Sequence, residues 1–319
     1  MSLAFVFPGQ GSQSVGMLAE LAAAYPEVRQ TFGQVSEVLG YDLWDLVQSG
    51  PETELNQTHK TQPVMLAAGV AVWRVWQTRQ GARPMMMAGH SLGEYTALVC
   101  AGALDFNDAV RLVAERGRYM QEAVPAGEGA MAAILGLEDA QVIQVCAEAA
   151  VAPGASLAEV VAAVNFNSPG QVVVAGTAAA VARAVELAKQ AGAKRALMLP
   201  VSVPSHCLLM KPAADRLAVL LQTVALKTPE IPVINNADVA VCVEADKIRD
   251  ALVRQLYNPV RWVETIRAMA NAGVKSLVEC GPGKVLAGLN KRIERDMTAL
   301  PVFDPVTLDE ALQAWPLPA

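Results

Sequence analysis

The stretch Gly89-His90-Ser91-Leu92-Gly93 has the form Gly-x-Ser-x-Gly, which is the pattern of a nucleophile elbow. A short apolar run precedes it and a run compatible with a helix follows it. This order predicts a strand, a sharp turn and a helix, in which the glycines let the backbone approach itself closely. The serine hydroxyl would then stand at a helix N-terminus, where free N–H groups can stabilise an oxyanion. The alternative is an ordinary strand-to-helix turn with an incidental serine.

The composition excludes several classes of protein. The chain has 319 residues, of which 53% are hydrophobic, so one large domain or two smaller ones can form a core. No uninterrupted apolar stretch reaches about 18 residues, and the N-terminus lacks the basic region of a signal peptide. Five scattered cysteines without a Cys-x-x-Cys pair suggest neither a disulfide framework nor a zinc site. With a net charge of −6 and no long basic run, nucleic acid is not an expected partner, and we expect a cytoplasmic protein.

Short apolar segments alternate with amphipathic ones along the chain, which predicts an α/β fold. Parallel strands are expected at 3–7, 84–88, 231–235 and 275–280. Helices are expected over much of 15–48, 62–80, 92–101, 107–123, 208–226, 246–256 and 260–272. The tail beyond Asp296 is left unassigned.

A second unit is expected inside the first. From 127 to 199 the pattern predicts a strand, a helix, two strands, a helix and a strand, which is the ferredoxin-like order. The large α/β domain would therefore be discontinuous, formed by 1–126 and 200–319. A cleft between the two units is the natural place for a substrate.

A serine nucleophile needs a general base, and the chain has only three histidines, His59, His90 and His206. His90 is adjacent to Ser91 and would point away from its oxygen, while His59 lies in a polar run expected to be a surface loop. Elimination therefore favours His206, although a loop histidine held by backbone hydrogen bonds is an alternative. No acid can be singled out by spacing, so the third member of a triad is left open and need not be a side-chain carboxylate.

Arg116 shares one side of the expected helix 107–124 with Val113 and Met120, at about 100° per residue. This apolar side indicates a half-buried guanidinium, which is costly unless it is paired. Two interpretations stay open. Arg116 forms a structural ion pair with a protein carboxylate, or it clamps a carboxylate of the substrate.

Two glycine-rich loops follow expected strands. The first, FPGQGSQ at 7–13, could present a backbone N–H towards the elbow and complete an oxyanion hole with the N–H of Leu92. Its Gly-x-Gly is too short for a dinucleotide fingerprint and lacks the lysine of a P-loop. The second loop, at 279–284, is interpreted as an ordinary helix start with an early proline.

A set of motifs in one order resembles the malonyl-CoA:acyl carrier protein transacylases of bacterial fatty-acid synthesis. The motifs are FPGQGSQ at 7–13, TQP at 61–63, GHSLGE at 89–94, RG at 116–117, NFNSPGQ at 165–171, VPSH at 203–206, QLYNP at 255–259 and GPG at 281–283. The match covers nearly all of 3–292, and acyltransferase domains of polyketide synthases share many of these motifs. The segment 151–164 is a few residues longer than is usual, so we expect a longer surface loop there.

The resemblance implies a hydrolase-like parallel-sheet core with an inserted ferredoxin-like subdomain. It implies that Ser91 takes up the malonyl group, that His206 is its base and that Arg116 binds the malonyl carboxylate. A backbone carbonyl near Gln255 would orient the histidine. The other implied site residues are Gln10 and Leu92, as backbone donors of the oxyanion hole, and Met120 and Asn165, as substrate contacts.

The implied activity is ping-pong transfer of malonyl from malonyl-CoA to the phosphopantetheine thiol of acyl carrier protein. We expect no cofactor, no metal, no nucleic-acid or membrane partner, and a monomer. One alternative is a serine esterase or thioesterase that uses the same serine and histidine, but a hydrolase of neutral esters has no use for Arg116. Another is a non-catalytic module that binds carrier protein, against which the intact Ser91, His206 and Arg116 argue.

Overall fold

The computed structural model describes residues 2–152, 157–201 and 203–316. A five-stranded sheet forms the larger part of the molecule, and all of its neighbouring strands pair in parallel. Its strands, in spatial order, are β7 (Val233–Ile234), β2 (Met86–Gly89), β1 (Leu3–Phe7), β8 (Ser276–Cys280) and β9 (Thr298–Val302). The predicted parallel strands are therefore present, with β9 as an additional edge strand.

The central strand β1 is buried on both faces, which is why its sequence is apolar without alternation. On one face Phe5 packs edge-on against Trp73 and Trp76 of α5 (Thr58–Thr78), with ring centroids 5.3 and 5.1 Å away. On the other face Ala4 and Val6 belong to a separate apolar cluster with α12 (Trp262–Asn271) and α13 (Val285–Ile293). Helices on both faces thus fix the central strands, whose ends carry the loops of the site.

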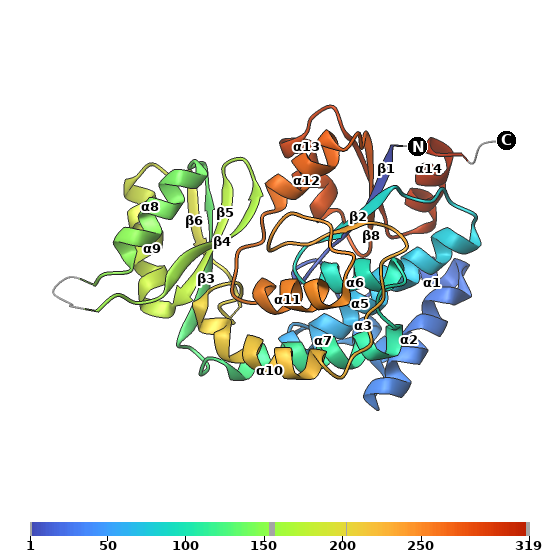
Figure 1. Ribbon diagram of the computed structural model, residues 1–319, viewed down its shortest axis with the longest axis horizontal. Helices are drawn as coiled ribbons and strands as arrows, with labels where there is room; N and C mark the ends of the chain where they lie inside the picture. The colour runs from blue at the N-terminus through green and yellow to red at the C-terminus, as the bar shows by residue number, and fades with distance from the viewer. Residues whose placement is uncertain (1, 153–156, 202, 317–319) are drawn as a thin grey trace.

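The remaining helices of this part lie around the sheet (Figure 1). They are α1 (Ala19–Ala24), α2 (Pro26–Leu39), α3 (Leu43–Ser49), α4 (Glu52–Leu55), α6 (Gly93–Cys100), α7 (Phe106–Glu122), the 3-10 helix η1 (Leu208–Met210), α10 (Lys211–Leu221), α11 (Ala245–Gln255) and α14 (Pro305–Ala314). Among the described residues, no helix combines the length and the apolar character needed to cross a membrane.

A second, antiparallel sheet lies at the left of Figure 1. Its strands, in spatial order, are β4 (Val161–Ser168), β5 (Gln171–Thr177), β3 (Gly129–Leu135) and β6 (Arg195–Met198). Two helices, α8 (Asp139–Ala149) and α9 (Ala178–Gln190), pack on one face of it. The predicted strand–helix–strand–strand–helix–strand order is therefore confirmed, and with it the α/β fold with a ferredoxin-like insertion.

The two sheets are joined by backbone pairing as well as by the connecting chain. The Phe166 N–H donates to the Val260 carbonyl at 3.0 Å, and the Val260 N–H donates to the Val164 carbonyl at 2.8 Å. A side-chain bond of 2.8 Å between His90 Nε2 and Asn167 Oδ1 links the elbow to the same strand. The antiparallel sheet is thus fixed against the ends of the parallel strands, while the exact division at 126 and 200 stays a prediction.

The helices expected over much of 15–48 are present, and local signals divide this stretch into α1, α2 and α3. Pro26 begins α2, and Gly40 ends it with a φ of 75°. The Asp42 side chain then caps α3 by accepting from the Asp45 N–H at 2.9 Å. The expected surface loop at His59 is wrong, since this residue lies in the first turn of α5.

The unassigned tail contains β9 and α14. Pro301 within β9 weakens the sequence signal for a strand, but it is tolerated because β9 lies at the sheet edge. Asp304 begins α14 with a capping box. Of the segment 151–164, residues 153–156 lie outside the described residues, and Val151 and Ala158 on either side form an isolated antiparallel bridge.

Replacing Gly93 tests the close packing that shapes the elbow. A Cβ atom at Gly93 would lie 2.1 Å from the Phe7 carbonyl oxygen, so the loop after β1 would have to move. We expect Gly93→Ala to lower the free energy of unfolding by about 3 kcal/mol, measured by urea denaturation. Gly33→Ala is the matched control, because no atom lies within 4 Å of the added Cβ and Gly33 is in a helix. The free energy of unfolding of Gly33→Ala should rise by up to about 1 kcal/mol. An equal decrease in both variants would contradict the account.

Candidate active site

Ser91 lies in a tight turn between β2 and α6, as the motif predicts. Its φ is 52°, in the left-handed region that residues other than glycine adopt only rarely. The turn closes on itself so tightly that a Cβ at Gly89 would lie 1.8 Å from the Gly93 carbonyl carbon. Only glycine fits at both ends, and the turn places the Ser91 hydroxyl at the start of α6.

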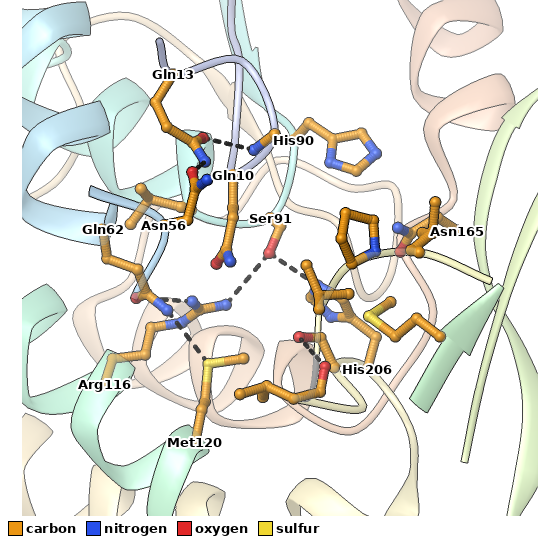
Figure 2. A pocket seen from close by; sticks show the side chains of 18 of the residues that line it. Gln10, Gln13, Asn56, Gln62, His90, Ser91, Arg116, Met120, Asn165 and His206 are labelled. Carbon is orange, nitrogen blue, oxygen red and sulfur yellow. Dashed lines mark hydrogen bonds between the residues drawn. The ribbon is translucent and has the colours of Figure 1, made fainter. Parts of the chain in front are cut away.

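His206 contacts the Ser91 hydroxyl, with 2.7 Å between Nε2 and Oγ (Figure 2). Its other ring nitrogen, Nδ1, lies 2.7 Å from the Gln255 carbonyl oxygen. Because a carbonyl can only accept, Nδ1 carries the hydrogen and Nε2 is left to accept from the serine. The third member of this arrangement is therefore a backbone carbonyl, one of the possibilities that the sequence left open.

The imidazole of His206 is neutral at physiological pH. Burial and, as a smaller cause, the positive charge of Arg116 together lower its pKa to about 3. The side chain is 3% exposed, so water does little to stabilise the protonated form. A neutral imidazole in hydrogen-bond contact with a serine hydroxyl can accept the hydroxyl proton when the oxygen reacts.

Arg116 is 1% exposed, more deeply buried than the sequence indicated. Its guanidinium donates to the amide oxygens of Gln62 and Gln255, both at 2.9 Å, and to the Ser91 hydroxyl at 3.3 Å. Among the described residues no carboxylate oxygen lies within 4.0 Å of it, and its Nε has no hydrogen-bond partner. An ion pair between Arg116 and a protein carboxylate, one of the two interpretations of the sequence, is therefore absent from the described residues. The hydrogen-bond partners of the guanidinium are neutral groups, namely two amide oxygens and one hydroxyl.

Two backbone N–H groups of the elbow differ in their partners. The Ser91 N–H donates to Asn236 Oδ1 at 2.7 Å, whereas the Leu92 N–H has no acceptor among the described residues. The loop that carries Gln10 lies beside it and is exposed, with Gln10 Nε2 3.4 Å from Thr58 Oγ1. The elbow therefore offers the Leu92 N–H, and not that of Ser91, to a developing negative charge.

A cavity of about 430 Å³ opens above the serine and lies between the two sheets. Its walls include seven of the eight predicted site residues, namely Gln10, Ser91, Leu92, Arg116, Met120, Asn165 and His206. Gln255 is fully buried behind it. Residues 131, 165 and 199–201 form the wall on the side of the antiparallel sheet, and the Asn165 Oδ1 there has no hydrogen-bond partner within the part of the chain that the structure describes. Across the described residues, no group of three or more His, Cys, Asp or Glu side chains could hold a metal ion.

Three buried polar residues that support the site were not predicted from the sequence. Gln62 holds both Arg116 and the Met120 sulfur, while Glu94 and Asn236 lie behind the elbow. Burial raises the pKa of Glu94 to about 7. A signal for Asn236 exists in the sequence, because polar residues just after a parallel strand lie at the edge where sites form. Nothing in the spacing indicates its partners.

The chain is similar in sequence to proteins of one known family. A family model described as an acyl transferase domain matches residues 4–301. The malonyl CoA-acyl carrier protein transacylase of Escherichia coli (strain K12) is 60% identical over 310 residues, which are 97% of this chain and 98% of that protein. The chain therefore belongs to the acyl transferases and, within them, to the malonyl CoA-acyl carrier protein transacylase family, as its motifs implied.

Solved structures agree with this family. An acyl carrier protein S-malonyltransferase from Vibrio cholerae has a TM-score of 0.93 and 59% identity, covering 97% of this chain and 99% of that one. A malonyl-transacylase solved in complex with its type II PKS acyl-carrier protein has a TM-score of 0.95 and 58% identity, covering 98% and 100%. The fold is therefore that of malonyl transacylases.

The pKa of His206 provides a test that needs no substrate. In ¹⁵N spectra of the labelled protein, we expect the His206 ring to stay neutral from pH 7 down to pH 4.5. Because the charge of Arg116 contributes to the low pKa, Arg116→Met should raise that pKa, whereas Arg116→Lys should keep it low. The assignment is made with His206→Gln. A wild-type ring that protonates near pH 6.5, or no difference between the two Arg116 variants, would contradict this electrostatic account.

Proposed function

We propose that this acyltransferase moves malonyl from malonyl-CoA to the phosphopantetheine thiol of acyl carrier protein, through a malonyl ester on Ser91. The observation that carries the proposal is the buried guanidinium of Arg116, 3.3 Å from the Ser91 hydroxyl and without a carboxylate partner among the described residues. The neutral imidazole of His206 on the same hydroxyl supports it. A serine, a base and a cation that no carboxylate contacts directly among the described residues together suit an acyl group that carries its own carboxylate.

In the first half-reaction Ser91 Oγ attacks the thioester carbonyl while His206 Nε2 takes the hydroxyl proton. The N–H groups of Leu92 and Gln10 would stabilise the oxyanion of the tetrahedral intermediate. The carbon–sulfur bond then breaks, the CoA sulfur takes the proton from His206 Nε2, and CoA leaves as the thiol. The carbonyl of Gln255 keeps Nδ1 protonated throughout, so Nε2 is free to exchange the proton.

The second half-reaction runs the same steps with a different thiol. The phosphopantetheine thiol gives its proton to His206 and attacks the malonyl ester, and Ser91 leaves with that proton. A hydrolase would let water take the place of this thiol. The proposed transferase instead holds the ester until carrier protein arrives.

Arg116 accounts for the choice of acyl group. Its charge is already desolvated, so a malonyl carboxylate placed against it forms a pair without a further cost of burying the cation. An acetyl group leaves that charge unmatched, a penalty on the order of 3–5 kcal/mol in buried sites. The preference for malonyl would therefore come from this one residue.

The proposal also includes the second substrate, the oligomeric state and the location of the enzyme. The malonyl-transacylase solved with its type II PKS acyl-carrier protein supports a carrier protein as the second substrate. We propose that the enzyme works as a monomer. We propose a cytoplasmic enzyme that needs no cofactor beyond its two thioester-forming substrates and binds neither nucleic acid nor membrane.

The covalent intermediate is the first test. Incubation with malonyl-CoA should add one malonyl group to the wild-type chain, detected by intact mass, and should release free CoA. Ser91→Ala should gain no mass, because it lacks the oxygen that forms the ester. The adduct should persist until phosphopantetheinylated carrier protein is added. An adduct that hydrolyses within seconds without carrier protein would favour the esterase or thioesterase alternative.

The second test concerns selectivity. Removing the guanidinium in Arg116→Ala should lower the ratio of malonyl to acetyl acylation rates by about 100-fold or more. Arg118→Ala is the matched control, since Arg118 is on the same helix but is exposed and paired with Glu115 and Glu122. Its ratio should stay at the wild-type value. An unchanged ratio in Arg116→Ala would remove the basis for malonyl selectivity.

A further inference from the structure

Two buried polar residues, Asn236 and Glu94, lie behind the elbow and are not among the residues that line the cavity. Asn236 is 1% exposed and follows β7, and Glu94 is 2% exposed in the first turn of α6. They bond to each other, with 2.9 Å between the Asn236 N–H nitrogen and Glu94 Oε2. We infer that they are positioning residues: Asn236 fixes the turn that carries Ser91, and Glu94 fixes the amide that holds Arg116. The inference rests on the proposed acyl transfer.

The Asn236 side chain spans the elbow. Its Nδ2 donates to the Gly89 carbonyl at 2.7 Å, and its Oδ1 accepts from the Ser91 N–H, also at 2.7 Å. A left-handed residue such as Ser91 persists only where its surroundings hold it, and one amide here holds both ends of the turn. The same bond occupies the Ser91 N–H, which leaves the neighbouring Leu92 N–H as the free donor of the elbow.

Glu94 determines which way the amide of Gln255 points. Glu94 Oε2 accepts from Gln255 Nε2 at 2.8 Å, so the amide oxygen faces the other way and accepts from Arg116 Nη2 at 2.9 Å. If the amide were reversed, its NH₂ group would face the guanidinium, and two donors cannot bond. The same Nε2 also donates to the Ser91 carbonyl at 3.0 Å. Glu94 is therefore connected to both Arg116 and Ser91 by the hydrogen bonds of one glutamine, Gln255.

The role of Glu94 requires an acceptor oxygen rather than a charge. A glutamine at this position keeps one oxygen where Oε2 accepts from Asn236 and Gln255, whereas alanine removes it. Because the bonds from Asn236 and Gln255 converge on one oxygen, its loss frees two donors in a buried region. Loss of Glu94 should therefore disturb Arg116 most, and loss of Asn236 should disturb Ser91 most.

The test is single-turnover acylation of Ser91, followed by intact mass with malonyl-CoA and with acetyl-CoA. Asn236→Ala should slow both acyl groups by about 10- to 30-fold while the final labelled fraction stays at the wild-type level. Glu94→Ala should slow malonyl more than acetyl, so that the ratio of the two rate constants falls at least about fivefold. Glu94→Gln should restore most of that ratio. Asn236→Asp keeps the shape but cannot donate to the Gly89 carbonyl, so it should also be slow.

Two control variants separate positioning from loss of stability. Asn235→Ala removes side-chain bonds to Ala240 and Cys242 in the adjacent turn, and Glu279→Ala removes a buried carboxylate that caps α13. Both should lower the melting temperature but keep the wild-type rate and acyl ratio.

The inference is overturned if Asn236→Ala and Asn236→Asp acylate at the wild-type rate, or if Glu94→Gln loses as much selectivity as Glu94→Ala. The inference is also overturned if Asn235→Ala or Glu279→Ala changes the acylation rate and the acyl ratio as much as the Asn236 and Glu94 variants do. Absence of a malonyl adduct on the wild type itself would instead contradict the proposed function, so the two failures are distinguishable.

Discussion

The guanidinium of Arg116 is buried without a carboxylate oxygen within 4.0 Å among the described residues, and the site is organised around that constraint. A buried cation is tolerated only when its N–H groups are bonded, and here amide oxygens from two distant parts of the chain supply the bonds. Burial and the same charge lower the pKa of His206, which keeps the imidazole able to accept a proton. Arg116 thus helps to keep this imidazole neutral and leaves a positive charge beside the serine.

The fold brings these parts together at the carboxyl ends of adjacent parallel strands. The loop after β1 and the turn after β2 touch at Gly93, where no side chain fits. The antiparallel sheet is bonded to the segment before α12 through Val260, and it supplies the opposite wall of the cavity. The cavity therefore exists because one sheet is fixed across the strand ends of the other.

Local patterns were enough to predict the elbow, most parallel strands and the order of the inserted unit, because each signal lies within a few residues. His206 could be selected because the chain has only three histidines. The partners of Arg116 could not be predicted, since its bonds to Gln62 and Gln255 join positions 54 and 139 residues apart. Asn236 was missed for the same reason. The edge strand β9 was missed because its proline weakens the signal that burial usually gives.

The most direct test of the central claim compares one protein with two acyl groups on the same serine. Malonyl-enzyme and acetyl-enzyme carry the same ester on Ser91 and differ only in a terminal carboxylate. If the buried guanidinium of Arg116 forms an ion pair with that carboxylate, the malonyl-enzyme should melt at a higher temperature than both the acetyl-enzyme and the free enzyme in scanning calorimetry. A malonyl-enzyme that melts at or below the acetyl-enzyme would contradict the account.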